Sequence, residues 1–263
     1  MIDFPAFLAQ ASYYYNNGND FYQSGVGSMY SGLTLLGLAI LVFTMILGGI
    51  VQSGLKSAFS RYAQEPAPLT GAEAARLMLR QNGIENVQVI STPGRLTDHY
   101  NPLDRTVNLS ESVYNEASVA ALAVAAHECG HAVQHARAYP WLGLRSSLVP
   151  MVNLGSRLGQ IVLMAGLVLV GMGSSTTVAW VGLALYATTT LFALVTLPVE
   201  FDASRRALAW LEQSGLATRA MHGQAGTALR WAAMTYVAAA LSSLAMLLYY
   251  ALILLSRANS NRD

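Results

Sequence analysis

Three residues near the middle of the chain have the types and the spacing of a metal-dependent peptidase. His127, Glu128 and His131 form an HExxH motif within an alanine-rich stretch that predicts a helix. Residues four apart share one face of a helix, so the two imidazoles can bind one Zn²⁺ at about 2.0–2.1 Å each. Glu128 could then take a proton from water and pass it to a leaving amine, which is the chemistry of peptide hydrolysis. The alternative interpretation is a helix that carries two surface histidines and binds no metal.

A catalytic zinc ion needs a third protein ligand and one open position. The candidates for this ligand are Glu200, Asp202, His99, His135 and His222. Glu200 is favoured because a predicted transmembrane hairpin returns the chain, just before this residue, to the side that it left after His131. Asp202 lies at the expected start of a helix, where a carboxylate complements the helix dipole, so its presence can be explained without a metal. His135 is rotated by about 80° from His127 on the same helix, which disfavours it as a ligand.

Two further residues of the motif region restrict the type of site. Gln134 occupies the position of the glycine in the longer metzincin pattern, so a ligand set of two histidines and one glutamate describes the sequence better. Cys129 is the single cysteine, which excludes an intramolecular disulfide. It could serve as a spare metal ligand, but on a helix it points about 200° away from His127, and we expect it to pack in the interior.

Composition places the chain among membrane proteins. Of its 263 residues, 54% are hydrophobic and only 11% are charged, whereas soluble domains have about 25% charged residues. The apolar residues form long runs that can span a bilayer. The net charge of +1, without a basic cluster interleaved with aromatics, gives no indication of nucleic-acid binding. We expect a mainly α membrane protein with about four transmembrane helices and a small cytoplasmic α+β catalytic part of the zincin type.

The distribution of charge predicts how the chain is divided and oriented. The expected segments are a polar extracytoplasmic N-terminus (1–30), a first span (31–54), a cytoplasmic catalytic part (55–146), a second span (147–173), a third span (176–197), a cytoplasmic helical segment (198–231), a fourth span (232–255) and a tail (256–263). Of the 15 Lys and Arg residues, two lie in the tail, none lies in 1–30, and the other 13 lie on the predicted cytoplasmic side. This bias indicates that both termini are outside and that the catalytic part is inside.

The catalytic part reads as a mixture of helices and short strands. Thr70 and Glu73 form a capping box that predicts a helix ending near residue 82. Residues 87–90 and 106–109 predict two short strands, residues 116–136 predict the HExxH helix, and residues 205–231 predict a helical hairpin. A sheet beside the HExxH helix would allow an extended substrate to add to its edge through main-chain hydrogen bonds.

Several sequence blocks resemble a known family. The run from Leu96 to Tyr100, the block Ala-Ala-His-Glu-Cys-Gly-His-Ala-Val-Gln-His and the block Leu-Pro-Val-Glu-Phe-Asp-Ala-Ser-Arg-Arg look like those of the YugP-like membrane zinc metallopeptidases, over about residues 55–255. The layout is more distantly similar to the HtpX and Ste24 gluzincins, in which the ligand glutamate belongs to a Glu-x-x-Ala-Asp pattern. Glu200 and Ala203 match this pattern, but Ser204 replaces its aspartate. Asp202 or Arg205 could substitute for the supporting bond that this aspartate would make.

These features together predict an integral membrane zinc endopeptidase of the gluzincin type. Zn²⁺ would be held by His127, His131 and Glu200, and Glu128 would move the proton, with His222, Tyr100 or His99 as candidate donors to the oxyanion. The expected substrates are membrane or membrane-proximal proteins, and the resemblance implies a bacterial plasma membrane. The sequence gives no indication of the oligomeric state.

Two other functions fit parts of the sequence. An intramembrane protease of the site-2 type would need the HExxH motif inside a span and a later aspartate ligand, and no aspartate lies in the spans after residue 131. A membrane scaffold with a structural zinc site, or with none, would not need Glu128. Substitution of Glu128 would separate the scaffold from the protease.

Overall fold

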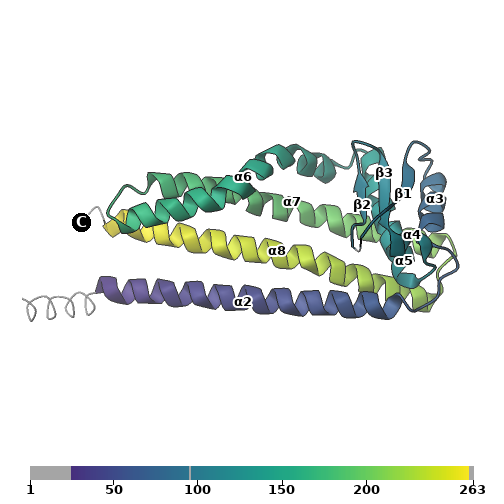
Figure 1. Cartoon of the computed structure of the whole chain (residues 1–263), viewed down its shortest axis with the longest axis horizontal. Helices are drawn as coiled ribbons and strands as arrows, with labels where there is room; N and C mark the ends of the chain where they lie inside the picture. Colours follow the sequence, from purple (N-terminus) through teal and green to yellow (C-terminus); the bar gives the residue numbers. More distant parts are fainter. Residues whose placement is uncertain (1–24, 95, 261–263) are drawn as a thin grey trace, which may run out of the picture.

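Four long helices run alongside one another for most of the length of the molecule (Figure 1). They are α2 (Gly25–Tyr62), α6 (Pro140–Gly171), α7 (Thr177–Gln213) and α8 (Arg219–Ser260). The computed structural model describes residues 25–94 and 96–260. Most of the polar N-terminus predicted for 1–30, and the last three residues of the tail, therefore lie outside the described residues.

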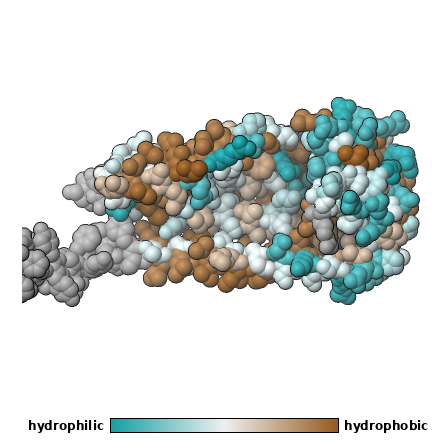
Figure 2. All heavy atoms as spheres, in the orientation of Figure 1, coloured by the Kyte–Doolittle hydropathy of each residue, from teal (hydrophilic) through white to brown (hydrophobic). Residues whose placement is uncertain are grey.

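All four long helices are long and apolar enough to cross a membrane. Their outer surfaces carry large apolar side chains, such as Met45, which is 68% exposed, and Ile161, which is 65% exposed. Figure 2 shows hydrophobic residues along the long helices and hydrophilic residues gathered at the end that carries the small sheet. Apolar side chains at this exposure are expected where lipid, rather than water, surrounds the protein. The prediction of a mainly α membrane protein with four transmembrane helices is confirmed.

The spans are parts of longer helices that continue into the polar end. α7 runs through Pro198 without interruption, although proline removes one backbone hydrogen bond and usually ends a helix. Membrane helices tolerate proline where neighbouring helices and side chains satisfy the freed backbone groups. The helical hairpin predicted for 205–231 is therefore not a separate element, but the last turns of α7 followed by the first turns of α8.

The polar end is built from short helices and a three-stranded sheet. Its elements are α3 (Gly71–Gln81), β1 (Gln88–Thr92), β2 (His99–Asn101), β3 (Thr106–Ser110), α4 (Glu111–Asn115) and α5 (Val119–Ala136). The strand order is β1-β3-β2, with β1 parallel and β2 antiparallel to β3. β2 is thus an edge strand, and it is the one strand that the sequence did not predict.

Local sequence accounts for the helix starts in this part. The side chain of Thr70 accepts a hydrogen bond from the Glu73 N–H, and the Glu73 carboxylate accepts one from the Thr70 N–H, so the predicted capping box is present. The hydroxyl of Ser118 caps α5 by accepting from the Ala121 N–H. This cap begins α5 a few residues later than predicted, because the separate short helix α4 precedes it.

An apolar core joins the sheet to α5, which carries the HExxH motif, and to α3, α7 and α8. Its fully buried members include Met78 of α3, Leu109 of β3, Leu122 of α5 and Leu211 of α7. Burial of each such side chain contributes about 1.5–3 kcal/mol relative to exposure. Because α5 lies between the sheet and α7 in this core, its position is fixed from both sides.

Candidate active site

Two helices bring three metal-binding side chains together. The Nε2 atom of His127 lies 3.3 Å from Oε2 of Glu200, and the Nε2 atom of His131 lies 3.7 Å from the same oxygen. The ligand atoms of these three residues all lie within 4.8 Å of one another, and no other such group of three occurs among the described residues. Of the five candidates for the third ligand, the structure thus places Glu200 beside the two histidines.

This convergence depends on close contact between α5 and α7. Gly130 lies inside the HExxH motif, and a Cβ atom added to it would be only 2.6 Å from the main-chain oxygen of Ala203. Only glycine permits two helix backbones to approach this closely. Ala203 itself is fully buried, three residues after Glu200. The small residues at this crossing therefore set the distance between the imidazoles and the carboxylate.

Ser204 orients the first histidine. Its hydroxyl lies 3.1 Å from Nδ1 of His127, across the contact between α7 and α5. A bond to Nδ1 leaves the other ring nitrogen free for a metal, which is the usual arrangement around metal-binding histidines. Ser204 thus supplies a polar contact to a histidine from the neighbouring helix.

Gln134 orients the second histidine and fixes its tautomer. The Gln134 amide nitrogen donates to the main-chain oxygen of Val199 at 2.8 Å and to Oδ2 of Asp202 at 3.0 Å. Its oxygen must therefore face Nδ1 of His131, 3.0 Å away. Because an amide oxygen only accepts, Nδ1 of His131 carries the hydrogen and Nε2 presents a lone pair towards Glu200. Gln134 is completely buried, so this arrangement is shielded from water.

Asp202 and Arg205 do not bond the histidines directly. Asp202 pairs with Arg205 and with Arg206, whose Nε lies 2.6 Å from Oδ2 of Asp202. The supporting role predicted for Asp202 is thus indirect, because Gln134 stands between this carboxylate and His131. Arg205 is 76% exposed and contacts only Asp202 within this network.

The donor set fits a divalent cation. Glu200 is 2% exposed, and its Oε2 atom is buried without a hydrogen-bond partner among the described residues. Its other oxygen, Oε1, lies 3.3 Å from a guanidinium nitrogen of Arg145. A buried carboxylate oxygen that faces imidazole lone pairs is unfavourable unless a cation lies between them. Two imidazoles and one carboxylate are also the ligands found in catalytic zinc sites.

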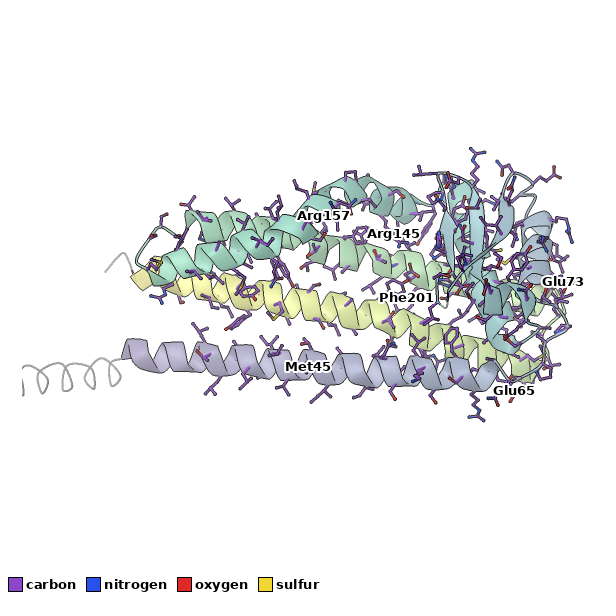
Figure 3. All side chains as sticks on the ribbon, viewed as in Figure 1. Met45, Glu65, Glu73, Arg145, Arg157 and Phe201 are labelled. Atoms are coloured by element: carbon purple, nitrogen blue, oxygen red, sulfur yellow. The ribbon has the colours of Figure 1, made fainter. Side chains whose placement is uncertain are left out.

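The electrostatics of the group also favour positive charge. Burial alone would lower the pKa of His131, but the nearby Glu200 carboxylate outweighs burial and raises it. Arg145 balances part of this negative charge from α6, where its guanidinium also lies over the ring of Phe192. Figure 3 shows Arg145 on the part of α6 that approaches the small sheet. The negative field at the histidines is thus strongest where their Nε2 atoms meet Oε2.

Glu128 lies between the metal group and the open edge of the sheet. Its Oε2 accepts a hydrogen bond of 3.0 Å from the Tyr100 N–H of β2. Because this N–H faces Glu128 and not β3, the main-chain oxygen of Tyr100 also faces the open edge. Asp98 holds the start of β2 in place by accepting a 2.7 Å bond from the Ser110 N–H at the end of β3. The Glu128 carboxylate and the edge strand are therefore directly connected.

The remaining candidate ligands and oxyanion donors lie outside the group formed by His127, His131 and Glu200. His99 is exposed, and its Nδ1 lies 2.8 Å from the main-chain oxygen of Thr97. His222 lies in the first turn of α8, and His135 bonds the phenol of Tyr100 at 2.7 Å. Burial raises the pKa of the Cys129 thiol far above its usual range, and its Sγ donates to the Ala75 oxygen, so packing accounts for it.

Four contributors to the site were not predicted from the sequence. Ser204 and Gln134 carry recognisable signals, because one follows Glu200 by four residues and the other follows His131 by three. Arg145 has a weaker signal, a lone cation at the start of an apolar run. Tyr236 of α8 interacts electrostatically with both Glu200 and Glu128, and nothing in its sequence context indicates this.

Comparisons with known proteins show the family of the chain. Residues 37–255 match the family described as "Putative neutral zinc metallopeptidase". The chain is 40% identical over 212 residues to "Putative membrane protease YugP" of Bacillus subtilis (strain 168), a match that covers 80% of this chain and 92% of that protein. No solved structure matches the chain significantly. The family resemblance of the sequence blocks is confirmed, and the chain belongs to this family of neutral zinc metallopeptidases.

Proposed function

We propose that this protein is a membrane-bound endopeptidase in which His127, His131 and Glu200 bind Zn²⁺ and Glu128 transfers the proton. One observation carries the proposal, namely that both Nε2 atoms and a partnerless carboxylate oxygen converge beside Glu128. A structural zinc site needs no additional carboxylate, whereas a hydrolytic site does. The arrangement therefore favours the protease over the scaffold.

The roles of the protein groups follow from their positions. A bound Zn²⁺ supplies Lewis acidity, which polarises the scissile carbonyl and makes water acidic enough to ionise near neutral pH. Glu128 accepts the proton from the attacking water and then delivers it to the leaving nitrogen. The Tyr100 N–H holds the Glu128 carboxylate in place for both transfers. Ser204 and Gln134 keep the two histidines in the orientation that a metal needs.

The substrate is proposed to bind as an additional strand along β2. The main-chain oxygen of Tyr100 faces the open edge, and the N–H of the same residue donates to Glu128, so a peptide that pairs through this oxygen has its backbone beside the Glu128 carboxylate. Main-chain pairing depends little on sequence, which suits an endopeptidase. An antiparallel arrangement is favoured because antiparallel pairs are slightly more stable for each residue.

Tyr236 of α8 is a further candidate donor to the oxyanion. Its phenol lies close enough to Glu200 and Glu128 to be affected by both carboxylates, whereas the exposed His99 bonds the main-chain oxygen of Thr97. A donor aimed at the developing negative charge is worth about 10²–10³ in kcat. The Tyr236→Phe variant should lose activity on this scale and keep its zinc, and Tyr249→Phe on the same helix serves as its control.

The proposed location is the cytoplasmic face of a bacterial plasma membrane. The charge bias of the chain supports this orientation, and the name of the Bacillus subtilis relative supports the membrane setting. Because Glu200 lies on α7, which continues into a membrane span, the proposed substrates are membrane proteins and their membrane-proximal segments.

The test is zinc content and peptide hydrolysis on the detergent-purified full chain. We expect about one zinc per chain in the wild type and in Glu128→Gln, but casein cleavage in the wild type alone. Glu200→Gln should lose the zinc, whereas Glu212→Gln, an exposed glutamate of α7, should behave as the wild type. Full zinc occupancy in Glu200→Gln would overturn the ligand set, and casein cleavage by Glu128→Gln would overturn the role of the carboxylate.

A further inference from the structure

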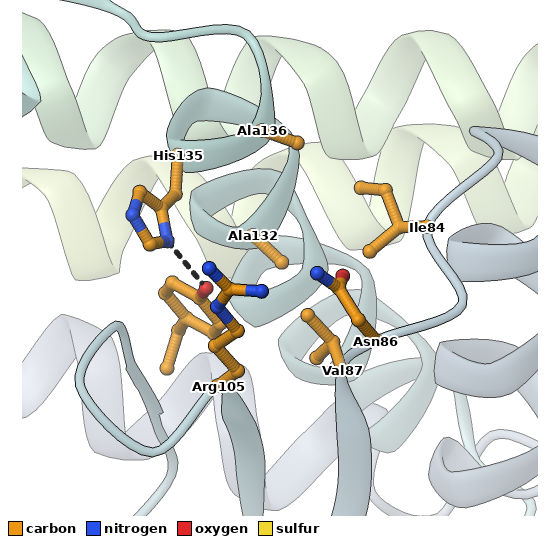
Figure 4. A pocket seen from close by; sticks show the side chains of 8 residues that line it. Ile84, Asn86, Val87, Arg105, Ala132, His135 and Ala136 are labelled. Carbon is orange, nitrogen blue, oxygen red and sulfur yellow. Dashed lines mark hydrogen bonds between the residues drawn. The ribbon is translucent and has the colours of Figure 1, made fainter.

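A cavity opens beside the catalytic strand, on the side of Tyr100 that faces the C-terminal end of α5. It has a volume of about 130 Å³ and is lined by Ile84, Asn86, Tyr100, Arg105, Ala132 and His135, among others. Figure 4 shows the guanidinium of Arg105 and the amide of Asn86 pointing towards each other in this space. The cavity therefore combines an apolar floor with polar groups at its mouth.

Tyr100 connects this cavity to the catalytic centre. Its main-chain N–H donates to Glu128, while its phenol bonds Nδ1 of His135 in the cavity wall at 2.7 Å. His135 follows the metal-binding His131 by one helical turn. A peptide bound along β2 with its scissile bond at Glu128 would thus pass the strand whose Tyr100 side chain forms one wall of the cavity.

The charge in the cavity is positive. No Asp or Glu among the described residues lies within ion-pairing distance of Arg105, and the residues that line the cavity include no carboxylate. Burial raises the pKa of Tyr100, so its phenol remains a donor at neutral pH. A guanidinium presents several N–H donors in a fixed planar arrangement that matches a carboxylate.

The strand directions indicate which part of a substrate meets the cavity. Arg105 immediately precedes β3, and Val87, which also lines the cavity, immediately precedes β1. β1 and β3 are parallel and β2 runs against them, so the cavity lies where β2 ends. A peptide antiparallel to β2 places there the residues N-terminal to its scissile bond.

We infer that this cavity is a substrate subsite that binds a carboxylate, and that it selects an acidic side chain on the N-terminal side of the bond to be cleaved. The inference rests on the proposed peptidase function and adds a preference to it. The shared chemistry is the carboxylate, which an Asp or Glu side chain or the end of a peptide can supply. The antiparallel geometry favours the side chain.

The test compares quenched fluorescent peptides that differ at one residue. Amidated peptides carry Glu, Gln or Lys in turn at each of the three positions before the scissile bond, and a second set carries a free C-terminal carboxylate. The peptides are incubated with the zinc-loaded full chain in detergent. Three forms are compared, namely the wild type, Arg105→Glu, and Arg219→Glu, which changes an exposed arginine of α8 outside the cavity. Anisotropy of the same peptides on the Glu128→Gln protein measures binding without hydrolysis.

At one of these positions we expect the wild type to prefer Glu over Gln about fivefold in kcat/KM, the scale of a solvent-accessible ion pair. Arg105→Glu should reverse the order, with Lys preferred over Glu, and Arg219→Glu should match the wild type. The wild type could instead prefer peptides with a free C-terminal carboxylate, and Arg105→Glu could abolish that preference. This result would support the subsite and show that it binds the carboxylate at the end of the peptide. Equal rates for Glu and Gln, or a Glu preference that survives in Arg105→Glu, would overturn the inference.

The binding measurement distinguishes a failure of the subsite from a failure of the proposed peptidase function. Absence of cleavage of every peptide by the wild type would count against the proposed peptidase. In that case the subsite would still be supported if the Glu128→Gln protein binds the Glu peptide about fivefold more tightly than the Gln peptide. Equal binding of the two peptides would reject the subsite alone, even if the wild type cleaves both.

Discussion

The Cα atom of Gly130 in α5 lies directly against the main-chain oxygen of Ala203 in α7. A Cβ atom at Gly130 would be 2.6 Å from that oxygen, well inside van der Waals contact. The atom in the way belongs to a helix backbone, which cannot rotate aside as a side chain can. This contact lies between His127 and His131 on one helix and beside Glu200 on the other, so it determines the size of the metal group.

Gly130→Ala should therefore separate the histidines from Glu200. We expect zinc content to fall well below one per chain and the free energy of unfolding to fall by about 1–3 kcal/mol, as for other overpacked contacts. Gly143→Ala in the first turns of α6 is the matched control, because a Cβ there meets no atom within 4 Å. Zinc analysis and melting temperature in detergent check both variants. Wild-type zinc content in Gly130→Ala would contradict this account of the crossing.

Ser204→Ala should weaken zinc binding without removing any ligand. The variant loses the polar partner of Nδ1 of His127, and loss of such partners typically costs 10–100-fold in metal affinity. The Kd measured by competition with a chelator gives the change. Ser214→Ala, whose hydroxyl bonds a main-chain oxygen at the end of α7, should leave the Kd unchanged.

Gln134→Leu tests the link from Asp202 to His131. Leucine has a similar size but cannot accept from Nδ1 of His131 or donate to Asp202 and to the main-chain oxygen of Val199, so three buried polar groups lose a partner. We expect a loss of about 1–3 kcal/mol in the free energy of unfolding for each group left unsatisfied, together with weaker zinc binding. Gln213→Leu, at an exposed position, is the control. An unchanged melting temperature in Gln134→Leu would show that this buried chain of bonds contributes little.

The proposed orientation can be measured with single cysteines at the two ends of α7. Cys129 is buried and its thiol pKa is raised, so a membrane-impermeant maleimide should not react with the native protein. We expect Ser174→Cys, in the turn between α6 and α7, to be labelled in intact cells. Gln213→Cys, at the other end of α7, should be labelled only after permeabilisation. The opposite pattern would place the catalytic part outside.

The parts of the fold that were predictable from the sequence are those that depend on local patterns. Uncharged apolar runs predict the four spans, the Thr70 and Glu73 side chains predict the start of α3, and alternation over 106–109 predicts most of β3. β2 has only three residues, too few for any periodicity to be visible. Its strand geometry comes from pairing with β3 and from Asp98, which bonds the end of that strand.

The details of the site depend on how two helices are rotated about their axes. The sequence places Glu200 near the HExxH helix because the membrane hairpin returns the chain there. It does not show which face of α7 meets α5, and so the sequence suggests Asp202 or Arg205, in place of Ser204, as the support for a histidine. The close contact at Gly130 fixes that rotation and directs Ser204, rather than Arg205, towards His127.

The proposed metal ligands are also separated in the order of synthesis. His127 and His131 leave the ribosome long before Glu200, and the intervening residues form the α6–α7 hairpin. A nascent chain that ends before this hairpin holds two imidazoles and no carboxylate to complete the group. The proposed metal site can thus be completed only after the α6–α7 hairpin and Glu200 have been synthesised.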